Sequence, residues 1–205
     1  VGVVSWGQVS SNLFCGIQPT PQTLIRGEGA AELVGDIGLL CSAPSPSVGS
    51  PIPTYNLTVT LNSPLTSRVL ADHLSEALLI IDEAFPSQPN PATAARWPDS
   101  GRPQNLCRAE GGTACEILET GITDGTPGGD YDGSSGHYNT FEGVVSGFNS
   151  VSFLGVPISG EVSLRIINIR ADAADFLTPP FKSAQIEATV TTDPGASAGW
   201  TTVAL

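Results

Sequence analysis

The chain has 205 residues, of which 40% are hydrophobic and 14% are charged, and this balance describes a foldable protein rather than a disordered one. Eight Lys and Arg residues against 20 Asp and Glu residues give a net charge of -12, which disfavours binding to nucleic acid or to anionic membrane surfaces. No apolar run in the sequence approaches the ~18–20 residues that span a bilayer, so membrane insertion is not expected.

Short segments separated by turn residues run through the whole sequence. The 23 glycines and 17 prolines punctuate it, and alternation of apolar and polar residues between them predicts an all-β fold. We expect a single antiparallel β-sandwich, jelly-roll or immunoglobulin-like, over residues 13–205, with residues 1–12 as a separate N-terminal strand and a long loop insertion at about 84–138. The expected strands are Val1–Ser10, Ala31–Cys41, Tyr55–Asn62, Glu76–Asp82, Phe141–Leu154, Gly160–Arg170, Ala184–Thr192 and Trp200–Leu205.

The first expected strand, Val1–Ser10, carries no charge and has apolar residues on both faces. A free strand of this kind can complete the sheet of a neighbouring subunit, because sheet edges offer unpaired backbone groups. Head-to-tail donation does not close and therefore yields a filament or tube. Docking of the strand on its own domain is an equally weighted alternative. The expected assembly residues are Val1, Val3, Val4, Trp6 and Val9.

Two features of the sequence point to export. The chain has no methionine and begins Val-Gly-Val-Val, which predicts a mature form whose signal peptide has been removed. Its four cysteines make an even set without a C-x-x-C pair, so disulfides in an oxidising compartment are favoured over a zinc site. Proximity in sequence favours Cys15 with Cys41 and Cys107 with Cys115, the second pair tying down the long loop.

Three acids, Glu28, Glu32 and Asp36, are spaced four residues apart before Cys41. In a strand they would share the solvent face at intervals of about 13 Å, too far apart for paired catalytic carboxylates or a shared metal ion. The intervening glycines and β-branched residues argue against a helix that would cluster them. The residues expected to face the core are Ala31, Leu33, Ile37, Leu39 and Cys41.

The next two segments contain a sequon and an ambiguity. Asn56-Leu-Thr58 is an N-glycosylation sequon, and alternation with Tyr55 and Leu57 places the Asn56 side chain toward solvent. Between Val69 and Ile81 the apolar spacing fits a helix, while its second half also reads as a buried strand. We expect a turn or short helix that leads into a strand at Glu76.

The long loop holds a candidate calcium site at Asp124, Asp130 and Asp132. Hard oxygen ligands on a glycine-rich backbone suit calcium, and Asp130-Tyr-Asp132-Gly resembles the start of a calcium loop. The third acid of that motif and its distal glutamate are missing, so a solvated turn is favoured by about three to one. Calcium is the one cofactor that the sequence raises.

No catalytic constellation is complete. Gly195-Ala-Ser-Ala-Gly199 has the G-x-S-x-G pattern of a nucleophile elbow, but no histidine follows it, and a turn before the last strand is favoured. His73 and His137 could each act as a general base, yet neither has an identifiable nucleophile beside it. The protein is therefore not expected to be an enzyme.

A resemblance covers scattered pieces of residues 15–172. Cys15, then Arg26-Gly-Glu28-Gly-Ala-Ala-Glu32-Leu-Val-Gly-Asp36 and Cys41, resembles a signature of large secreted bacterial proteins of unknown function, Cys…R-x-E-G-x-T-E-L-V-G-D…Cys. Ala31 replaces the threonine of that pattern, and Asp172 stands where asparagine is expected. Similar blocks are Thr66-Ser-Arg68, Ser75–Glu83 and Leu164–Asp172. The resemblance implies an extracellular, β-rich surface or fibre-forming protein and supplies no catalytic residues.

Two functions follow as hypotheses. The first is a structural subunit of an extracellular filament, pilus or tube, whose partner is a further copy of the chain. The alternative is a secreted or cell-surface module that binds glycans through loop aromatics, which can stack on sugar rings; these are Trp97, Tyr131 and Tyr138.

Overall fold

The computed structural model describes residues 13–81, 105–118, 137–174 and 185–193, and the backbone of 196–204. Within these ranges the regular elements are β-strands and one 3-10 turn, which confirms the all-β class. The strands are β1 (Phe14–Gln18), β2 (Glu32–Leu33), β3 (Ile37–Ala43), β4 (Thr54–Leu61), β5 (Val69–Ala71), β6 (Leu74–Ile81), β7 (Leu106–Cys107), β8 (Thr140–Gly147), β9 (Ser150–Pro157), β10 (Gly160–Ile167), β11 (Arg170–Ala171), β12 (Ile186–Asp193) and β13 (Ala196–Ala204); the turn is η1 (Glu110–Gly112).

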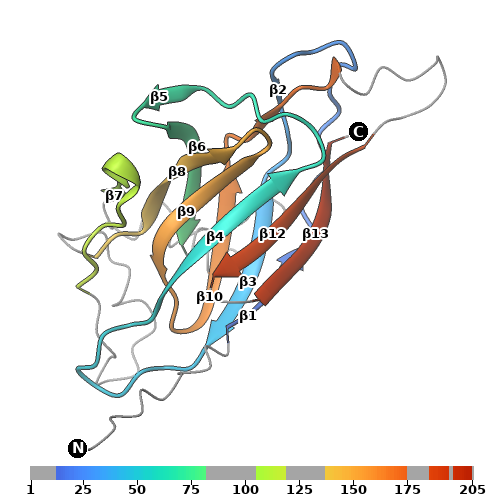
Figure 1. The fold of residues 1–205 in the computed structure, drawn as a ribbon. Coiled ribbons are helices and arrows are strands. Elements are labelled where there is room, and N and C mark those ends of the chain that lie inside the picture. The colour runs from blue at the N-terminus through green and yellow to red at the C-terminus, as the bar shows by residue number, and fades with distance from the viewer. Residues whose placement is uncertain (1–12, 82–104, 119–136, 175–184, 194–195, 205) are drawn as a thin grey trace, which may run out of the picture.

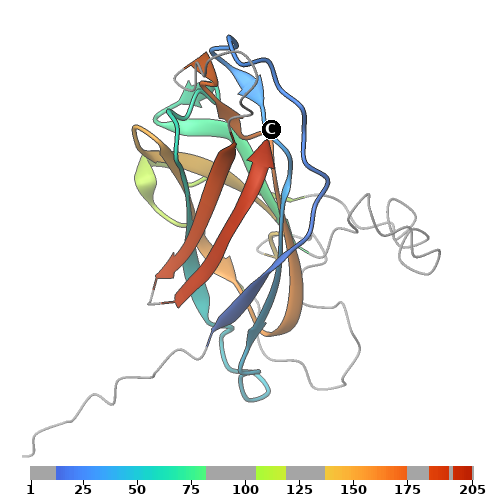
Figure 2. The ribbon, with the colours of Figure 1, turned by 90° about the vertical axis from the view of Figure 1, so that its right-hand side faces the viewer.

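Eleven strands form one hydrogen-bonded sheet in the order β1-β3-β10-β6-β8-β9-β4-β12-β13, with β5 added to β6 and β7 added to β8. The pairs along this order are antiparallel, whereas β7 pairs with β8 in parallel. Strands β2 and β11 form a second, two-stranded sheet. The main sheet curls strongly into a half-barrel, so that its terminal strands β1 and β13 come close together (Figures 1 and 2).

The core fills the inside of this curl. Period-2 alternation along β4 and β12 turns every second side chain inward, and those side chains are buried while the intervening ones are not. β3 and β10 contribute their apolar residues from the opposite side of the curl. The largest fully buried side chains are Phe141, Phe153, Ile37, Leu39, Leu57, Leu61, Leu79, Ile158, Leu164, Ile166, Ile169 and Ile186.

The expected single strand Ala31–Cys41 is wrong, because the chain passes from the small sheet to the main sheet in the middle of it. β2 ends at Leu33, which is 43% exposed, and Val34 is buried instead and donates its N–H to the Ile169 carbonyl at 3.0 Å. Across the three residues between β2 and β3, the alternation of buried and exposed side chains shifts by one position. Ile37, Leu39 and Cys41 still face the core as expected.

The expected turn or short helix before Glu76 is a β-hairpin. Val69–Ala71 pairs with β6, and the turn between them places Asp72 and His73 at positive φ, 42° and 67°. The His73 carbonyl accepts a 2.8 Å hydrogen bond from the Val145 N–H, which fixes the turn against β8. The helical spacing was misleading because β5 lies outside the core, where its apolar residues are exposed.

Other boundaries differ by short stretches. The expected strand Phe141–Leu154 is the hairpin β8–β9, and β10 ends at Ile167 before Asn168 at φ 61°. The final strand begins at Ala196, earlier than the expected Trp200. Tyr55–Asn62 and Ala184–Thr192 agree with β4 and β12 to within two residues.

Candidate functional site

The two ends of the main sheet are β1 and β13. Eight antiparallel pairings separate them in the strand order, so the two strands run in the same direction. Cα atoms of the two strands approach within 8 Å, yet no ladder joins them among the described residues. They lie nearest at the start of β1 and diverge toward its end (Figure 2). The half-barrel is therefore left open along a seam with an unpaired strand edge on each side.

A disulfide holds β1 to its neighbour. Cys15 and Cys41 lie directly opposite each other in the β1–β3 ladder, with Cα atoms 4.0 Å apart. Such a short separation marks a non-hydrogen-bonded pair, in which the backbone N–H and C=O groups point away from the partner strand. Cys15 therefore directs its backbone groups toward the free edge of β1. Ile17, two residues later, does the same. The disulfide thus fixes β1 to β3, while the outer backbone groups of β1 remain able to pair with an added strand.

The outward face beside this edge is apolar. Phe14 is 73% exposed and Leu40, opposite Gly16 in the β1–β3 ladder, is 37% exposed. A Cβ atom added to Gly16 would meet nothing within 4 Å, so the space over this glycine is open. β1 also carries no charged residue. Sheet edges that avoid pairing with other chains use charges, proline or short length, and β1 uses none of these except its modest length.

The outward face of the β9–β4–β12 region, next to the β13 end of the sheet, is different. Thr58 and Thr60 on β4 lie opposite Thr191 and Thr189 on β12, so hydroxyl groups form rows across the strands. Thr58 Oγ1 and Ser152 Oγ of β9 lie 2.8 Å apart in a hydrogen bond. This surface is polar and belongs to strands that are paired on both sides.

The short strands are protected at their ends. β2, β5, β7 and β11 have two or three residues each. Arg68 precedes β5, Arg108 follows β7, and Arg170 lies in β11. Length and charge both discourage pairing with another chain at these positions. Among the described residues, the terminal strands β1 and β13 are uncharged and, with five and nine residues, longer than these four strands.

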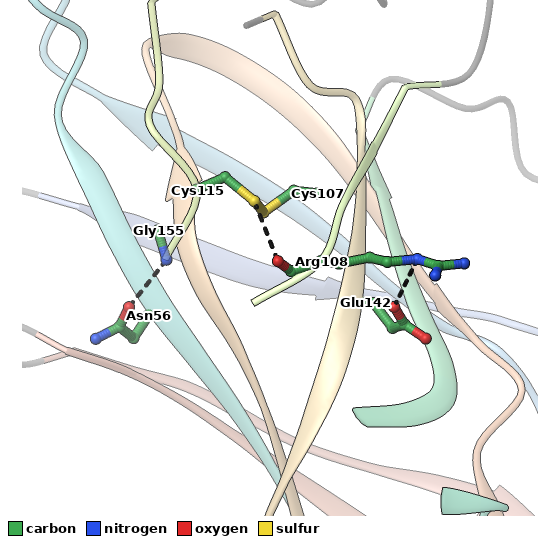
Figure 3. The surroundings of a disulfide bond; sticks show 6 residues. All are labelled: Asn56, Cys107, Arg108, Cys115, Glu142 and Gly155. Carbon is green, nitrogen blue, oxygen red and sulfur yellow. Dashed lines mark hydrogen bonds and ion pairs between the residues drawn. A yellow bond between two sulfur atoms is a disulfide. The ribbon is translucent and has the colours of Figure 1, made fainter. Parts of the chain in front are cut away.

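Residues 105–118 form a small cover over β8 and β9, seen around the second disulfide (Figure 3). Cys107 and Cys115 are bonded, which together with Cys15–Cys41 gives the two expected pairings. Gly155 has a positive φ of 67°, and a side chain there would meet Ala114, so the cover packs where only glycine fits. Arg108 Nε lies 3.4 Å from Oε2 of the buried Glu142 beneath the cover.

The sequon residue Asn56 lies in the same region. Its Oδ1 accepts a 3.0 Å hydrogen bond from the Gly155 N–H, next to an irregularity in the β4–β9 ladder (Figure 3). The side chain is partly buried rather than fully turned to solvent as expected. Asn56 thus has a structural role in joining β4 to β9, whether or not it carries a glycan.

The three spaced acids do not form a site. Glu28 is exposed in a loop, Glu32 lies in β2, and Asp36 lies between β2 and β3. Asp36 Oδ2 accepts hydrogen bonds from Arg165 Nη2 at 2.6 Å and Arg165 Nε at 3.0 Å. The acids were expected to line one strand face, and the break in that strand separates them. No group of three or more potential metal ligands occurs within the described ranges.

A charged cluster surrounds Glu76 on β6. Its Oε1 accepts hydrogen bonds from the Arg68 N–H at 3.0 Å and Arg170 Nε at 2.9 Å. Burial favours the neutral carboxyl group, but these hydrogen bonds and the two guanidinium charges outweigh it and hold the pKa of Glu76 below its usual value. These contacts link β6 to β11 and to the start of β5, so the cluster stabilises the packing of the strands.

The remaining candidates are dispersed. His73 lies in the β5–β6 turn, and His137 precedes β8 with a buried Nδ1 that has no hydrogen-bond partner among the described residues. Ser197 of the G-x-S-x-G pattern lies in β13, where it pairs with Thr191 of β12. A serine within a strand is not at the strand-to-helix turn of a nucleophile elbow. Tyr138 packs partly buried against the core.

Several predicted site residues lie outside the described residues. These are the calcium candidates Asp124, Asp130 and Asp132, the aromatics Trp97 and Tyr131, and the assembly residues Val1, Val3, Val4, Trp6 and Val9. The sequence reasoning missed the apolar surface at Phe14, Gly16 and Leu40. A signal was present, since FCGIQ is an uncharged strand whose outward positions are Phe14 and Gly16 rather than charged residues.

No family model and no curated protein sequence matches this chain. Within the ranges that the structure describes, no helix has the length and apolar character to cross a membrane. Two disulfides indicate folding in an oxidising environment, as is typical of extracellular proteins.

Proposed function

We propose that the protein is a secreted structural subunit that polymerises into an extracellular filament, pilus or tube by β-strand complementation. The observation that carries the proposal is the open seam between β1 and β13, two uncharged terminal strands of one sheet. Unpaired backbone groups along such edges bind an added strand. Residues 1–10 are an uncharged, strand-prone segment that a second copy could supply.

The charge distribution supports homopolymerisation through these segments. The chain has a net charge of -12, so contact between two arbitrary surfaces of two copies is opposed by repulsion. Residues 1–10, β1 and β13 contain no charged residue, and bringing them together avoids that cost. We further propose that the curled sheet is a β-sandwich of jelly-roll or immunoglobulin-like type, with the β1 and β13 ends meeting at the seam.

Deletion of residues 1–10 tests this function. The shortened protein should remain a folded monomer, as measured by size-exclusion chromatography with light scattering. Electron microscopy should show filaments of the full-length protein and none of the shortened protein. A matched control replaces Val69 and Leu70, exposed apolar residues on β5, with serine. This control should still assemble. Filaments formed by the deleted protein, or a full-length protein that stays monomeric under all conditions, would overturn the proposal.

A further inference from the structure

We infer that β1 is the edge that receives the donated segment, in antiparallel orientation, with Trp6 of one copy lying over Gly16 of the next. This inference rests on the proposed function and specifies the partner and register of its site. Three independent properties of β1 support it: the direction of its backbone groups, the apolar surface beside it, and the open space at its centre.

The backbone of β1 sets the hydrogen bonds of the new ladder. Cys15 and Ile17 direct their N–H and C=O groups to the free edge, as the 4.0 Å Cα separation of the Cys15–Cys41 pair implies. An antiparallel donor would form its hydrogen-bonded pairs with these two residues. Phe14, Gly16 and Gln18 would then lie in the closer, non-hydrogen-bonded pairs, where opposed side chains make their strongest contacts.

The apolar character of the donor matches this edge on both faces. Most edge strands have one apolar face, but residues 1–10 have apolar side chains on both. β1 offers buried Cys15 and half-buried Ile17 on the inward face, and exposed Phe14 with neighbouring Leu40 on the outward face. A strand with two apolar faces therefore has a partner for each of them here.

Open space over Gly16 sets the register. A glycine in an edge strand leaves its cross-strand neighbours uncovered, and an aromatic residue on the opposing strand can cover them. Trp6 is the largest side chain of the donor, and placed opposite Gly16 it would cover Leu40, which is 37% exposed. The pairs that follow are Val4 with Gln18, Trp6 with Gly16 and Gln8 with Phe14 facing outward, and Ser5 with Ile17, Gly7 with Cys15 and Val9 with Leu13 facing inward.

The donor would be antiparallel to both sides of the seam, because β1 and β13 run in the same direction. A strand between them needs two interstrand spacings, about 9.5 Å in total. The two strands approach within 8 Å, so β13 must move outward where the seam is narrowest. Among the described strands β13 pairs with β12 alone, whereas β12 is also paired with β4, so the movement falls to β13.

Mixing two variants that each carry one added cysteine, beside the four that form the native disulfides, tests the inference. Full-length protein carrying Val4→Cys is assembled with full-length protein carrying Gln18→Cys, and mild oxidation should give a disulfide-linked heterodimer on a non-reducing gel. The non-hydrogen-bonded pairing brings the two Cα atoms to about 4.5 Å, which suits a disulfide. In the control, Thr189→Cys on the exposed face of β12 replaces Gln18→Cys, and no heterodimer should form.

The outcomes separate the inference from the function. Filaments in the micrographs without the Val4–Gln18 cross-link would overturn β1 as the acceptor and leave the polymer intact. The register pairs residues 4–9 of one copy with residues 13–18 of another, so two copies that exchange segments satisfy it as well. The cross-link without filaments would indicate such a closed dimer, which keeps β1 as the acceptor and overturns the polymer. Neither filaments nor the cross-link would overturn the function and the inference together.

A second pair of variants tests the contact at Gly16. Gly16→Asp places a charge beneath Trp6 without a clash inside the subunit, so the monomer should fold while its critical concentration for assembly rises tenfold or more, roughly 1.4 kcal/mol. Thr189→Asp adds the same charge on β12 and should leave assembly unchanged. Trp6→Ala should impair assembly and Trp6→Phe should largely restore it. Equal assembly of Gly16→Asp and the unmodified protein would contradict the register.

Discussion

The β1–β3 end of the sheet and its β9–β4–β12 region are built alike on the inside and differently on the outside. Both regions turn apolar side chains into one core, with Leu39 and Leu57 fully buried. On the outside, the β1–β3 end has Phe14, Gly16 and Leu40, whereas the β9–β4–β12 region has rows of serine and threonine hydroxyls. The inward pattern thus determines the fold, and the outward pattern together with a free edge determines which region can recruit a partner.

The largest effect should come from the inward positions that the two regions share. Leu39→Ala on β3 and Leu57→Ala on β4 each leave a cavity in a fully buried environment, and each should lower the free energy of unfolding by about 2–5 kcal/mol. Chemical denaturation measures both. A loss below about 1 kcal/mol at either position would contradict the tight packing of that side chain in the core.

The next effect concerns the disulfide that distinguishes the end of the sheet. Replacing Cys15 and Cys41 with alanine opens a loop with a sequence separation of 26 residues, and should cost about 3 kcal/mol of stability. Replacing Cys107 and Cys115, separated by 8 residues, should cost less, because the shorter loop restricts the unfolded chain less. Thermal unfolding of the two variants compares them. The reverse order would indicate that the cover contributes more than its loop length implies.

A smaller effect is expected for the charged cluster, a third kind of outward surface. Glu76→Gln removes the charge that Arg68 and Arg170 share and should cost about 1 kcal/mol at neutral pH. Because the folded pKa of Glu76 lies below its unfolded value, its contribution is present above the unfolded pKa and is lost as pH falls through the folded pKa. Between about pH 5 and pH 3 the variant should lose less stability than the unmodified protein, as measured by urea unfolding at each pH.

The smallest effect should come from giving the β9–β4–β12 region the apolar outward face of the β1–β3 end. Thr189→Val with Thr191→Val gives β12 an apolar outward face, and stability should change by no more than about 0.5 kcal/mol because both side chains are exposed. In the protein lacking residues 1–10, sedimentation velocity should still show a monomer, since β12 is paired on both sides. Dimerisation of this variant would show that apolar character alone, without a free edge, is enough to recruit a partner.

The sequence by itself determined the class of the fold and most of its inward residues. Alternation in β4, β10 and β12 encodes strands because side chains on successive residues point to opposite faces. Loop length favoured both disulfide pairings, and both are present. The sequence did not determine where a strand breaks. Local periodicity does not indicate that the chain passes from one sheet to another at Gly35, or that Asp72 and His73 form a turn.

The tertiary structure alone decided which strands lie at the ends of the sheet and what surrounds them. β1 and β13 are far apart in the sequence, and only the curl of the sheet brings them to one seam. Leu40 is 37% exposed on the outward face, where its neighbours across the ladders are Gly16 and Ser163, and these pairings depend on register rather than on any one residue. Burial and exposure at an edge arise from contacts distant in sequence, whereas the alternation that forms the strands is local.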